Sequence, residues 1–167
     1  MNAVDVEKIN PSFTISAGTR ASESGVLRGI AHRPVDGAAM QEVSECRLLP
    51  GRGMDTENRK PGKREITLIS VDSWRDACRQ LGADLPWPTR RANLLIEGID
   101  LSAGIGKSLR ISGVRIYIHG ETKPCGLMDK QFTGLRAALA PAFRGGVYGE
   151  VLNEGVVRIG DVVSVPS

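Results

Sequence analysis

The chain has 167 residues, the length of one domain, which can bury a core without disulfides or metals. Its formal net charge of +3 permits anionic ligands but does not by itself indicate nucleic-acid binding. Three cysteines without CxxC spacing and two distant histidines argue against a metal site built from protein ligands alone. Residues 1–22 lack the apolar segment of a signal peptide and no apolar run approaches roughly 18 residues, so we expect a cytoplasmic protein that does not enter the membrane.

Residues 1–24 are polar and rich in Ser, Thr and Gly, which predicts a flexible N-terminal lead-in before a single domain over residues 25–167. Residues 50–63 form a long, basic, glycine-rich loop, and loops of this length in compact domains are often functional. Strands are predicted over residues 25–32, 42–49, 65–70, 94–96, 109–119, 146–152, 156–159 and 162–165.

Two segments have helical periodicity. In residues 71–81, apolar side chains recur every three or four positions, Ser70 or Asp72 can cap the start, and Gly82 suits the end. Cys78 lies on the apolar face of this helix, which predicts a packed structural thiol. Residues 126–140 are the second predicted helix. Its apolar stripe is Met128, Phe132, Leu135 and Leu139, and Pro141 ends it.

Two segments repeat the pattern of a strand, a tight glycine turn and a second strand. They are Leu109-Arg-Ile-Ser-Gly-Val-Arg-Ile116 and Val157-Arg-Ile-Gly-Asp-Val-Val163. Short strands joined by glycine turns, with few helices, are typical of β-barrels. The sequence therefore predicts a mainly β fold, a closed or partly open barrel with two or more short helices.

Cys125 lies at a junction between a predicted strand and a predicted helix. A thiol at a helix N-terminus is near the positive end of the helix dipole, which favours the thiolate. Lys123 and His119 are close in sequence and can add to that effect. No apolar periodicity surrounds Cys125, whereas Cys46 lies inside a predicted strand. A reactive thiol and a buried inert one both remain open at Cys125 on this basis.

Cationic residues lie at two other junctions. Arg90, Arg91 and Asn93 precede an apolar strand, and guanidinium groups there suit recognition of a phosphate or another oxyanion. Arg144 precedes Gly145-Gly146, where flexible backbone can approach an anion closely. A solvated basic loop and a simple turn are the alternatives at these two places. Neither GxGxxG nor GxxxxGK[ST] is present, which excludes those two kinds of nucleotide-binding loop.

The order of these segments resembles the MOSC family, the domain named from the C-terminal part of molybdenum cofactor sulfurases. The similarity is closest to short, stand-alone bacterial members. The segments that carry it run in the family's order and cover most of residues 25–165: Gly25–Ile30, Gly51–Asp55, Arg64–Ile69, Arg90–Leu101, Gly106–Ile111, Lys123–Met128, Arg144–Gly155 and Gly160-Asp161.

The resemblance implies a strand-rich barrel of the MOSC or pyruvate-kinase-barrel-like type and a link to molybdenum cofactor or sulfur transfer. Cys125 occupies the position of a family cysteine proposed to carry sulfur as a persulfide or to ligate the metal. Arg91 and Asn93 match the family motif before the apolar strand, and Arg144 matches the residue before the Gly-Gly strand, so these three are candidate cofactor contacts. Arg90, Lys123 and His119 are further candidates. The chain departs from the family pattern at Gly53-Met54-Asp55, which no His follows, and this argues against ligand binding by the loop.

The favoured hypothesis is a sulfur carrier or cofactor-handling module that works with partner proteins. Cys125 would accept sulfur from a pyridoxal-phosphate-dependent cysteine desulfurase or touch the metal of a molybdenum cofactor, and deliver to a molybdoenzyme or redox partner. No pyridoxal phosphate site is readable in the chain itself. One alternative is a molybdenum-cofactor-dependent reductase component acting on N-hydroxylated compounds, so enzymatic activity stays open between sulfur transfer and reduction. A non-catalytic ligand- or protein-binding barrel is the other alternative.

Overall fold

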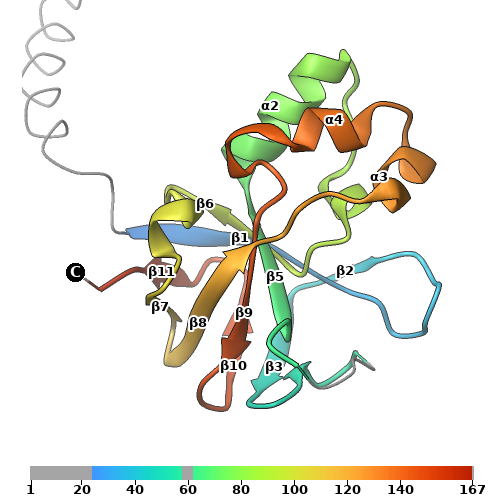
Figure 1. Ribbon diagram of the computed structural model, residues 1–167. Coiled ribbons are helices and arrows are strands. Elements are labelled where there is room, and N and C mark those ends of the chain that lie inside the picture. Colours follow the sequence, from blue (N-terminus) through green and yellow to red (C-terminus); the bar gives the residue numbers. More distant parts are fainter. Residues whose placement is uncertain (1–23, 58–61, 167) are drawn as a thin grey trace, which may run out of the picture.

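The computed structural model describes residues 24–57 and 62–166, and the predicted lead-in lies outside them except for Ser24. Seven strands form a barrel (Figure 1). Their order is β11 (Val162–Ser164), β7 (Ser108–Ile111), β8 (Val114–Glu121), β9 (Val147–Val151), β5 (Ile66–Ser70), β6 (Leu94–Glu97) and β1 (Ser24–His32). The antiparallel pairing of β1 with β11 closes the barrel, which confirms the predicted fold class.

Four short strands lie outside the closed barrel. β2 (Gln41–Val43) pairs with the end of β1, and β10 (Gly155–Arg158), β3 (Glu45–Leu49) and β4 (Gly53–Met54) form a small second sheet. The strand predicted over residues 42–49 is therefore divided at Ser44 between two sheets. The glycine turn at Gly160-Asp161 does not close a hairpin, because β10 and β11 also belong to different sheets. The turn at Ser112-Gly113 does close one, between β7 and β8.

The helix α2 (Val71–Leu81) has the bounds that the sequence predicts. Ser70 caps it by accepting a hydrogen bond from the backbone N–H of Ser73 at 3.0 Å, and Gly82 ends it in the left-handed conformation. Trp74 and Ala77 are buried on its inner face, and Cys78 packs at the edge of the same cluster. The structural role predicted for Cys78 agrees with this packing.

The second predicted helix, over residues 126–140, is wrong as a single element. It consists of α3 (Gly126–Gln131) and α4 (Leu135–Leu139). Phe132 is extended and Gly134 has a φ of +91°, so the chain leaves and re-enters helical geometry between them. All four residues of the predicted apolar stripe nevertheless pack into one cluster, because both short helices cover the same surface. The structure has three α-helices over the described residues.

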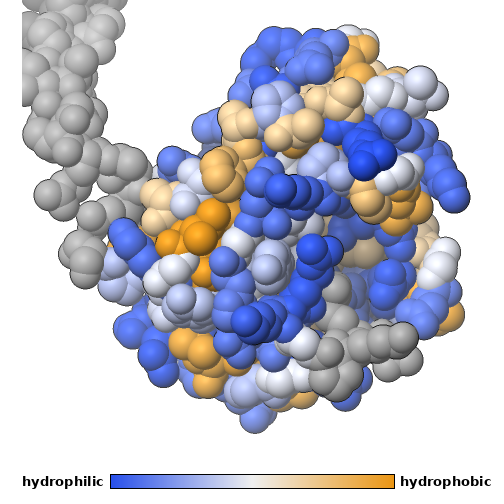
Figure 2. Space-filling view, viewed as in Figure 1, coloured by the Kyte–Doolittle hydropathy of each residue, from blue (hydrophilic) through white to orange (hydrophobic). Residues whose placement is uncertain are grey.

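Three short 3₁₀ turns complete the secondary structure: η1 (Trp87–Arg90), η2 (Leu101–Gly104) and η3 (Pro141–Phe143). None of the helices that the structure describes has the length and apolar character required to cross a membrane. On the face shown in Figure 2, apolar residues form separate small areas within a mostly hydrophilic surface.

Two apolar clusters hold the fold together, one inside the barrel and one between the barrel and the helices. Strand β5 contributes to both: Ile66 and Leu68 point into the barrel, whereas Ile69 packs under the helices. Figure 1 shows α2, α3 and α4 gathered over one end of the barrel. Both faces of β5 are therefore covered: Ile66, Leu68 and Ile69 are fully buried, and Thr67 between them is 7% exposed.

Candidate functional site

Cys125 lies on a cavity of about 180 Å³, the Cys125 cavity, where the helices meet the barrel. Sheet register creates this place. β1 and β8 end there, β6 and β9 begin there, and Thr67 of β5 lies among them. Five of the described residues that line it are cationic and none is a carboxylate: Arg33, Arg64, Arg90, Arg91 and Lys123. The site is therefore positive and suits an anion.

Cys125 is the accessible thiol among the three cysteines. It is exposed, occupies the N-cap position of α3 with extended backbone, and makes no capping hydrogen bond with its side chain. Cys46 is buried. Burial, with the nearby charges of Asp55, Glu57 and Glu45, raises the pKa of its thiol to about 12. Reactivity requires access and a thiolate, and Cys46 is unsuited on both counts, whereas Cys125 has the access.

Arg90 holds together the three segments around Cys125. Its Nε donates to the carbonyl oxygen of Gly145 at 2.9 Å, and Nη2 donates to that of Thr122 at 3.0 Å. Nη1 lies 3.5 Å from the sulfur of Met128 in α3. No side chain fits at Gly145, because a Cβ there would overlap the Thr122 carbonyl oxygen. Arg90 thus stabilises the wall of the cavity and also contributes positive charge to it.

The guanidinium of Arg90 is buried, yet it interacts electrostatically with Cys125. Burial lowers the pKa of Arg90 to about 10, a negative charge on Cys125 opposes this, and Arg64 adds to it. Arg90 is therefore charged at neutral pH. A negative charge on Cys125 thus favours the charged form of Arg90, which places the guanidinium and the sulfur within electrostatic reach of each other.

Arg91 also lines the cavity but faces a second segment. It has a left-handed backbone with φ of 67°, and its Nη2 donates to the carbonyl oxygen of Ala38 at 3.0 Å. Burial and the neighbouring charge of Arg33 lower the pKa of Arg91, while Glu57 opposes the shift. Two arginines held near each other in this way leave positive charge available to an anionic ligand.

Asn93 lies behind the cavity and is fully buried. Its Oδ1 accepts from the backbone N–H of Thr67 at 3.0 Å, and its Nδ2 donates to Glu57 at 3.1 Å and to the carbonyl oxygen of Ala31 at 3.3 Å. Glu57 also accepts from the backbone N–H of Arg33 at 2.8 Å. Asn93 therefore joins β1, β5 and the 50–63 loop. The structure gives it an anchoring position, not one on the cavity surface.

Two of the predicted contacts lie away from the cavity. Nε2 of His119 is 2.9 Å from Glu150, and its ring packs against Tyr117 and Tyr148, with centroids 4.8 and 6.1 Å away. Arg144 donates to Gln80 at 2.7 Å and to the carbonyl oxygen of Ala138 at 3.0 Å, which ties α2 to α4. Neither residue lines the Cys125 cavity.

Comparison with known proteins identifies the family of this chain. The model of the MOSC domain matches residues 50–164. The chain belongs to the MOSC domain family. This is a molybdenum-cofactor-related domain family, and the barrel agrees with it. No curated protein sequence matches the chain.

Solved structures resemble this MOSC domain in fold. The YuaD protein from Bacillus subtilis matches with a TM-score of 0.74 and 15% identity, over 85% of this chain and 95% of that one. YiiM from Escherichia coli matches with a TM-score of 0.66 and 14% identity, over 85% and 70% of the two chains. YiiM from Geobacillus stearothermophilus gives 0.64 and 13%, over 86% and 73%. At such identities the similarity concerns the fold alone.

Sequence reasoning missed four residues with charged or hydroxyl side chains that line the MOSC domain's cavity. Arg33 follows β1, Arg64 precedes β5, Thr67 lies within β5 and Thr122 follows β8. Arg64 also lies over the Tyr148 ring, 5.1 Å from its centroid. Arg33 and Arg64 could have been found from their position in the sequence, because each adjoins the end of a predicted strand, as Arg90 does. Which strand ends meet depends on the barrel's pairing, which local pattern does not reveal.

Two lining residues carry buried polar atoms that have no hydrogen-bond partner. They are Nε of Arg33 and Oγ1 of Thr122, whose residue is 6% exposed. A buried polar group left without a partner costs about 1–3 kcal/mol, so such atoms are rare in native proteins. Both can donate to an anion. The cations and these two donors fit the anionic, phosphate-bearing part of a molybdenum cofactor, and they fit smaller oxyanions equally.

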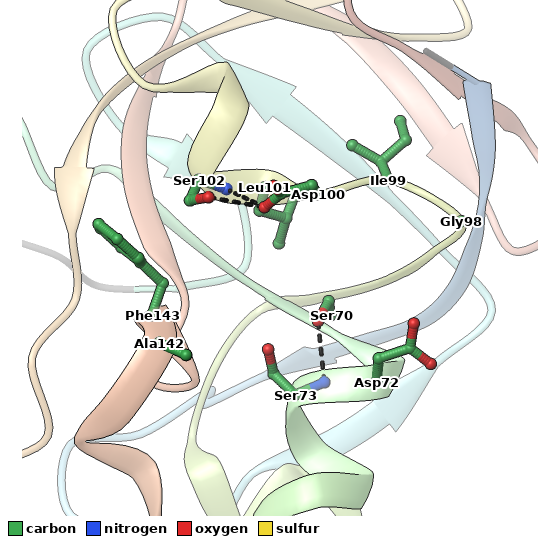
Figure 3. Close-up of a pocket in the computed structure, with 10 residues that line it drawn as sticks. All are labelled: Ser70, Asp72, Ser73, Gly98, Ile99, Asp100, Leu101, Ser102, Ala142 and Phe143. Carbon is green, nitrogen blue, oxygen red and sulfur yellow. Dashed lines mark hydrogen bonds between the residues drawn. The ribbon is translucent and has the colours of Figure 1, made fainter. Parts of the chain in front are cut away.

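A second cavity, of about 350 Å³, contains none of the predicted site residues (Figure 3). It lies between the first turns of α2 and η2. Two of its polar side chains cap those turns: Ser70 accepts from the N–H of Ser73 at 3.0 Å, and Asp100 accepts from the N–H of Ser102 at 3.0 Å. Local capping explains these groups, so the Cys125 cavity is the stronger candidate.

Proposed function

We propose that this MOSC domain is a sulfur carrier in molybdenum-cofactor-related chemistry, with Cys125 as the residue that holds the sulfur. One observation carries the proposal: the exposed thiol adjoins a cavity lined by five cations and no carboxylate among the described residues. A persulfide is an anion at neutral pH and benefits from such surroundings. The other two cysteines pack in apolar clusters.

The transfer needs no oxidant. The Cys125 thiolate attacks the outer sulfur of a donor persulfide, a new S–S bond forms at Cys125, and the donor's S–S bond breaks. The electron pair leaves with the donor as a thiolate, and Cys125 becomes a persulfide. The donor is expected to be a pyridoxal-phosphate-dependent cysteine desulfurase, since its persulfide has this chemistry.

The cations have separate roles in this proposal. Arg90 stabilises negative charge on the sulfur, and through its bonds to Gly145 and Thr122 it holds the cavity open. Arg33, Arg91 and Lys123, which line the cavity, would hold the anionic end of a molybdenum cofactor. Such a cofactor, when bound, supplies a metal centre that accepts sulfur or changes oxidation state. Arg144, predicted as a further contact, is replaced in this role by Arg33.

The deciding experiment loads the full chain with a cysteine desulfurase and cysteine and measures intact and peptide masses. We expect one added sulfur on Cys125, none in Cys125→Ala, and normal loading in the matched variant Cys78→Ala. No added sulfur, or equal amounts on all three cysteines, would contradict the proposal.

The same preparations separate the alternatives. Molybdenum that copurifies with the wild type and is lost in Cys125→Ala, without any sulfur loading, would support the reductase component acting on N-hydroxylated compounds. Cofactor binding and every assay unchanged in Cys125→Ala would support a non-catalytic binding barrel instead.

A further inference from the structure

Among the described residues, the cations that line the Cys125 cavity outnumber the carboxylates that interact with them, since Glu57 interacts electrostatically with Arg91 alone of the two groups with shifted pKa values. Within the described part of the chain, Arg64, Arg90 and Lys123 have no carboxylate at ion-pair distance, and the one such partner of Arg33 is the exposed Asp36, at 3.5 Å. Cations gathered without a counter-charge repel one another. A ligand with more than one negative charge removes that repulsion.

The size of the cavity limits what this ligand can be. Its volume is about 180 Å³, whereas pockets for larger organic ligands span about 300–1,000 Å³. A tetrahedral oxyanion with a few heavy atoms suits this space. A whole pterin would have to extend beyond it, with only its charged end inside.

The two unpartnered donors indicate where the oxyanion binds. Nε of Arg33 and Oγ1 of Thr122 belong to residues that follow two different strands, β1 and β8, and both residues line the cavity. Thr122 is also anchored, since its backbone N–H donates to Gly146 at 2.8 Å and its carbonyl oxygen accepts from Arg90 at 3.0 Å. The hydroxyl is therefore held in a fixed position three residues before Cys125.

We infer that the cavity binds a small sulfur oxyanion of the thiosulfate class, and that this anion is a sulfur donor for Cys125. The inference rests on the proposed sulfur-carrier function and adds a second class of donor to it. Such an anion joins a sulfonate group, which Arg33 and Thr122 would bind, to a transferable outer sulfur beside the thiol. A phosphate ester shares the tetrahedral oxyanion chemistry but brings no sulfur to Cys125.

The transfer balances without a further reactant. The Cys125 thiolate attacks the outer sulfur of thiosulfate, and a bond from Sγ to that sulfur forms while the S–S bond of thiosulfate breaks. The electron pair leaves with sulfite, and Cys125 becomes a persulfide. Negative charge develops on the sulfonate as it leaves, and preorganised cations stabilise developing charge of this kind.

The test uses the full chain with thiosulfate as the sole sulfur source, and follows sulfite release and the mass of the Cys125 peptide. We expect one sulfite and one added sulfur per chain, and neither product in Cys125→Ala. Thr122→Val and Arg33→Lys each remove a donor, so each should raise the half-saturating thiosulfate concentration about tenfold. Thr122→Ser keeps the hydroxyl and should retain the wild-type value.

Controls separate this inference from the proposed function. Thr133→Val and Arg110→Lys make the same changes at exposed positions away from the cavity and should behave as wild type. Loading by a cysteine desulfurase should be unchanged in Thr122→Val, since that donor brings no sulfonate.

Each contrary outcome has a definite meaning. Loading by the desulfurase but not by thiosulfate overturns the inference and leaves the sulfur-carrier function supported. If inorganic phosphate then binds with the same dependence on Thr122, the oxyanion that the cavity binds is a phosphate group. Loading by neither donor overturns both. Loading by thiosulfate with unchanged half-saturation in Thr122→Val and Arg33→Lys overturns the assigned subsite.

Discussion

Replacing Thr122 with Val tests the role of the Thr122 hydroxyl. We expect this hydroxyl to destabilise the ligand-free protein and to serve in binding a ligand. Thr122 is 6% exposed, and its Oγ1 has no hydrogen-bond partner. The substitution exchanges this hydroxyl for a methyl group of similar size. Most substitutions at buried positions lower stability, whereas we expect this one to raise it.

The magnitude follows from the burial and from a neighbouring residue. Leaving a buried hydroxyl unpaired costs about 1–3 kcal/mol, so Thr122→Val should raise the free energy of unfolding by about that amount. Thr67 lines the same cavity at 7% exposure, but its Oγ1 is bonded to Asn93 at 3.1 and 3.2 Å. Thr67→Val leaves Asn93 unpaired and should lower the free energy of unfolding by about 1–3 kcal/mol.

Urea unfolding at neutral pH, with thermal unfolding beside it, measures both variants. For a chain of this length each kcal/mol shifts the melting temperature by about 2–4 °C. The same substitution in one cavity wall should thus give shifts of opposite sign. At the same high concentration, thiosulfate should stabilise the wild type more than Thr122→Val, because stabilisation grows with the logarithm of the ligand concentration divided by Kd. A loss of stability in Thr122→Val equal to that in Thr67→Val would refute the reasoning.

Four further expectations concern other residues. Iodoacetamide should modify Cys125 in the native protein long before Cys46, as peptide mapping can show; equal rates would contradict the assigned exposures. Burial holds the pKa of Cys46 at about 12 against 9.0 for an ordinary thiol, so its contribution to stability is complete below about pH 9 and is lost between there and pH 12. Urea titrations should show a smaller loss over that range in Cys46→Ala. Arg144→Ala should leave sulfur loading intact and lower the free energy of unfolding by about 1 kcal/mol, since its bonds join helices outside the cavity. Asn93→Ala should lower it by about 3 kcal/mol or more, because several buried groups lose their partner; a loss below 1 kcal/mol would exclude its anchoring role.

The sequence was sufficient to predict those elements whose bounds are set by neighbouring residues. The bounds of α2 follow from the cap at Ser70, the apolar spacing that includes Trp74, and Gly82 at the end. The position of Cys125 between a strand and a helix was also predictable, because both neighbours have their own periodicity. The same reasoning joined α3 and α4 into one helix, since the apolar stripe continues through the break at Phe132 and Gly134 and both pieces pack on the same surface.

The Cys125 cavity depends on contacts between distant segments. Sequence alone predicted the basic surroundings of Cys125 and the barrel class, because composition and short-range spacing encode them, whereas the reactivity of Cys125 stays a prediction. Only barrel closure decided that Arg33 and Thr122 join Arg90 at the cavity while Arg144 and His119 turn elsewhere. The physical reason is register: which strand ends meet, and which face a side chain takes, is set by pairing between strands far apart in the chain.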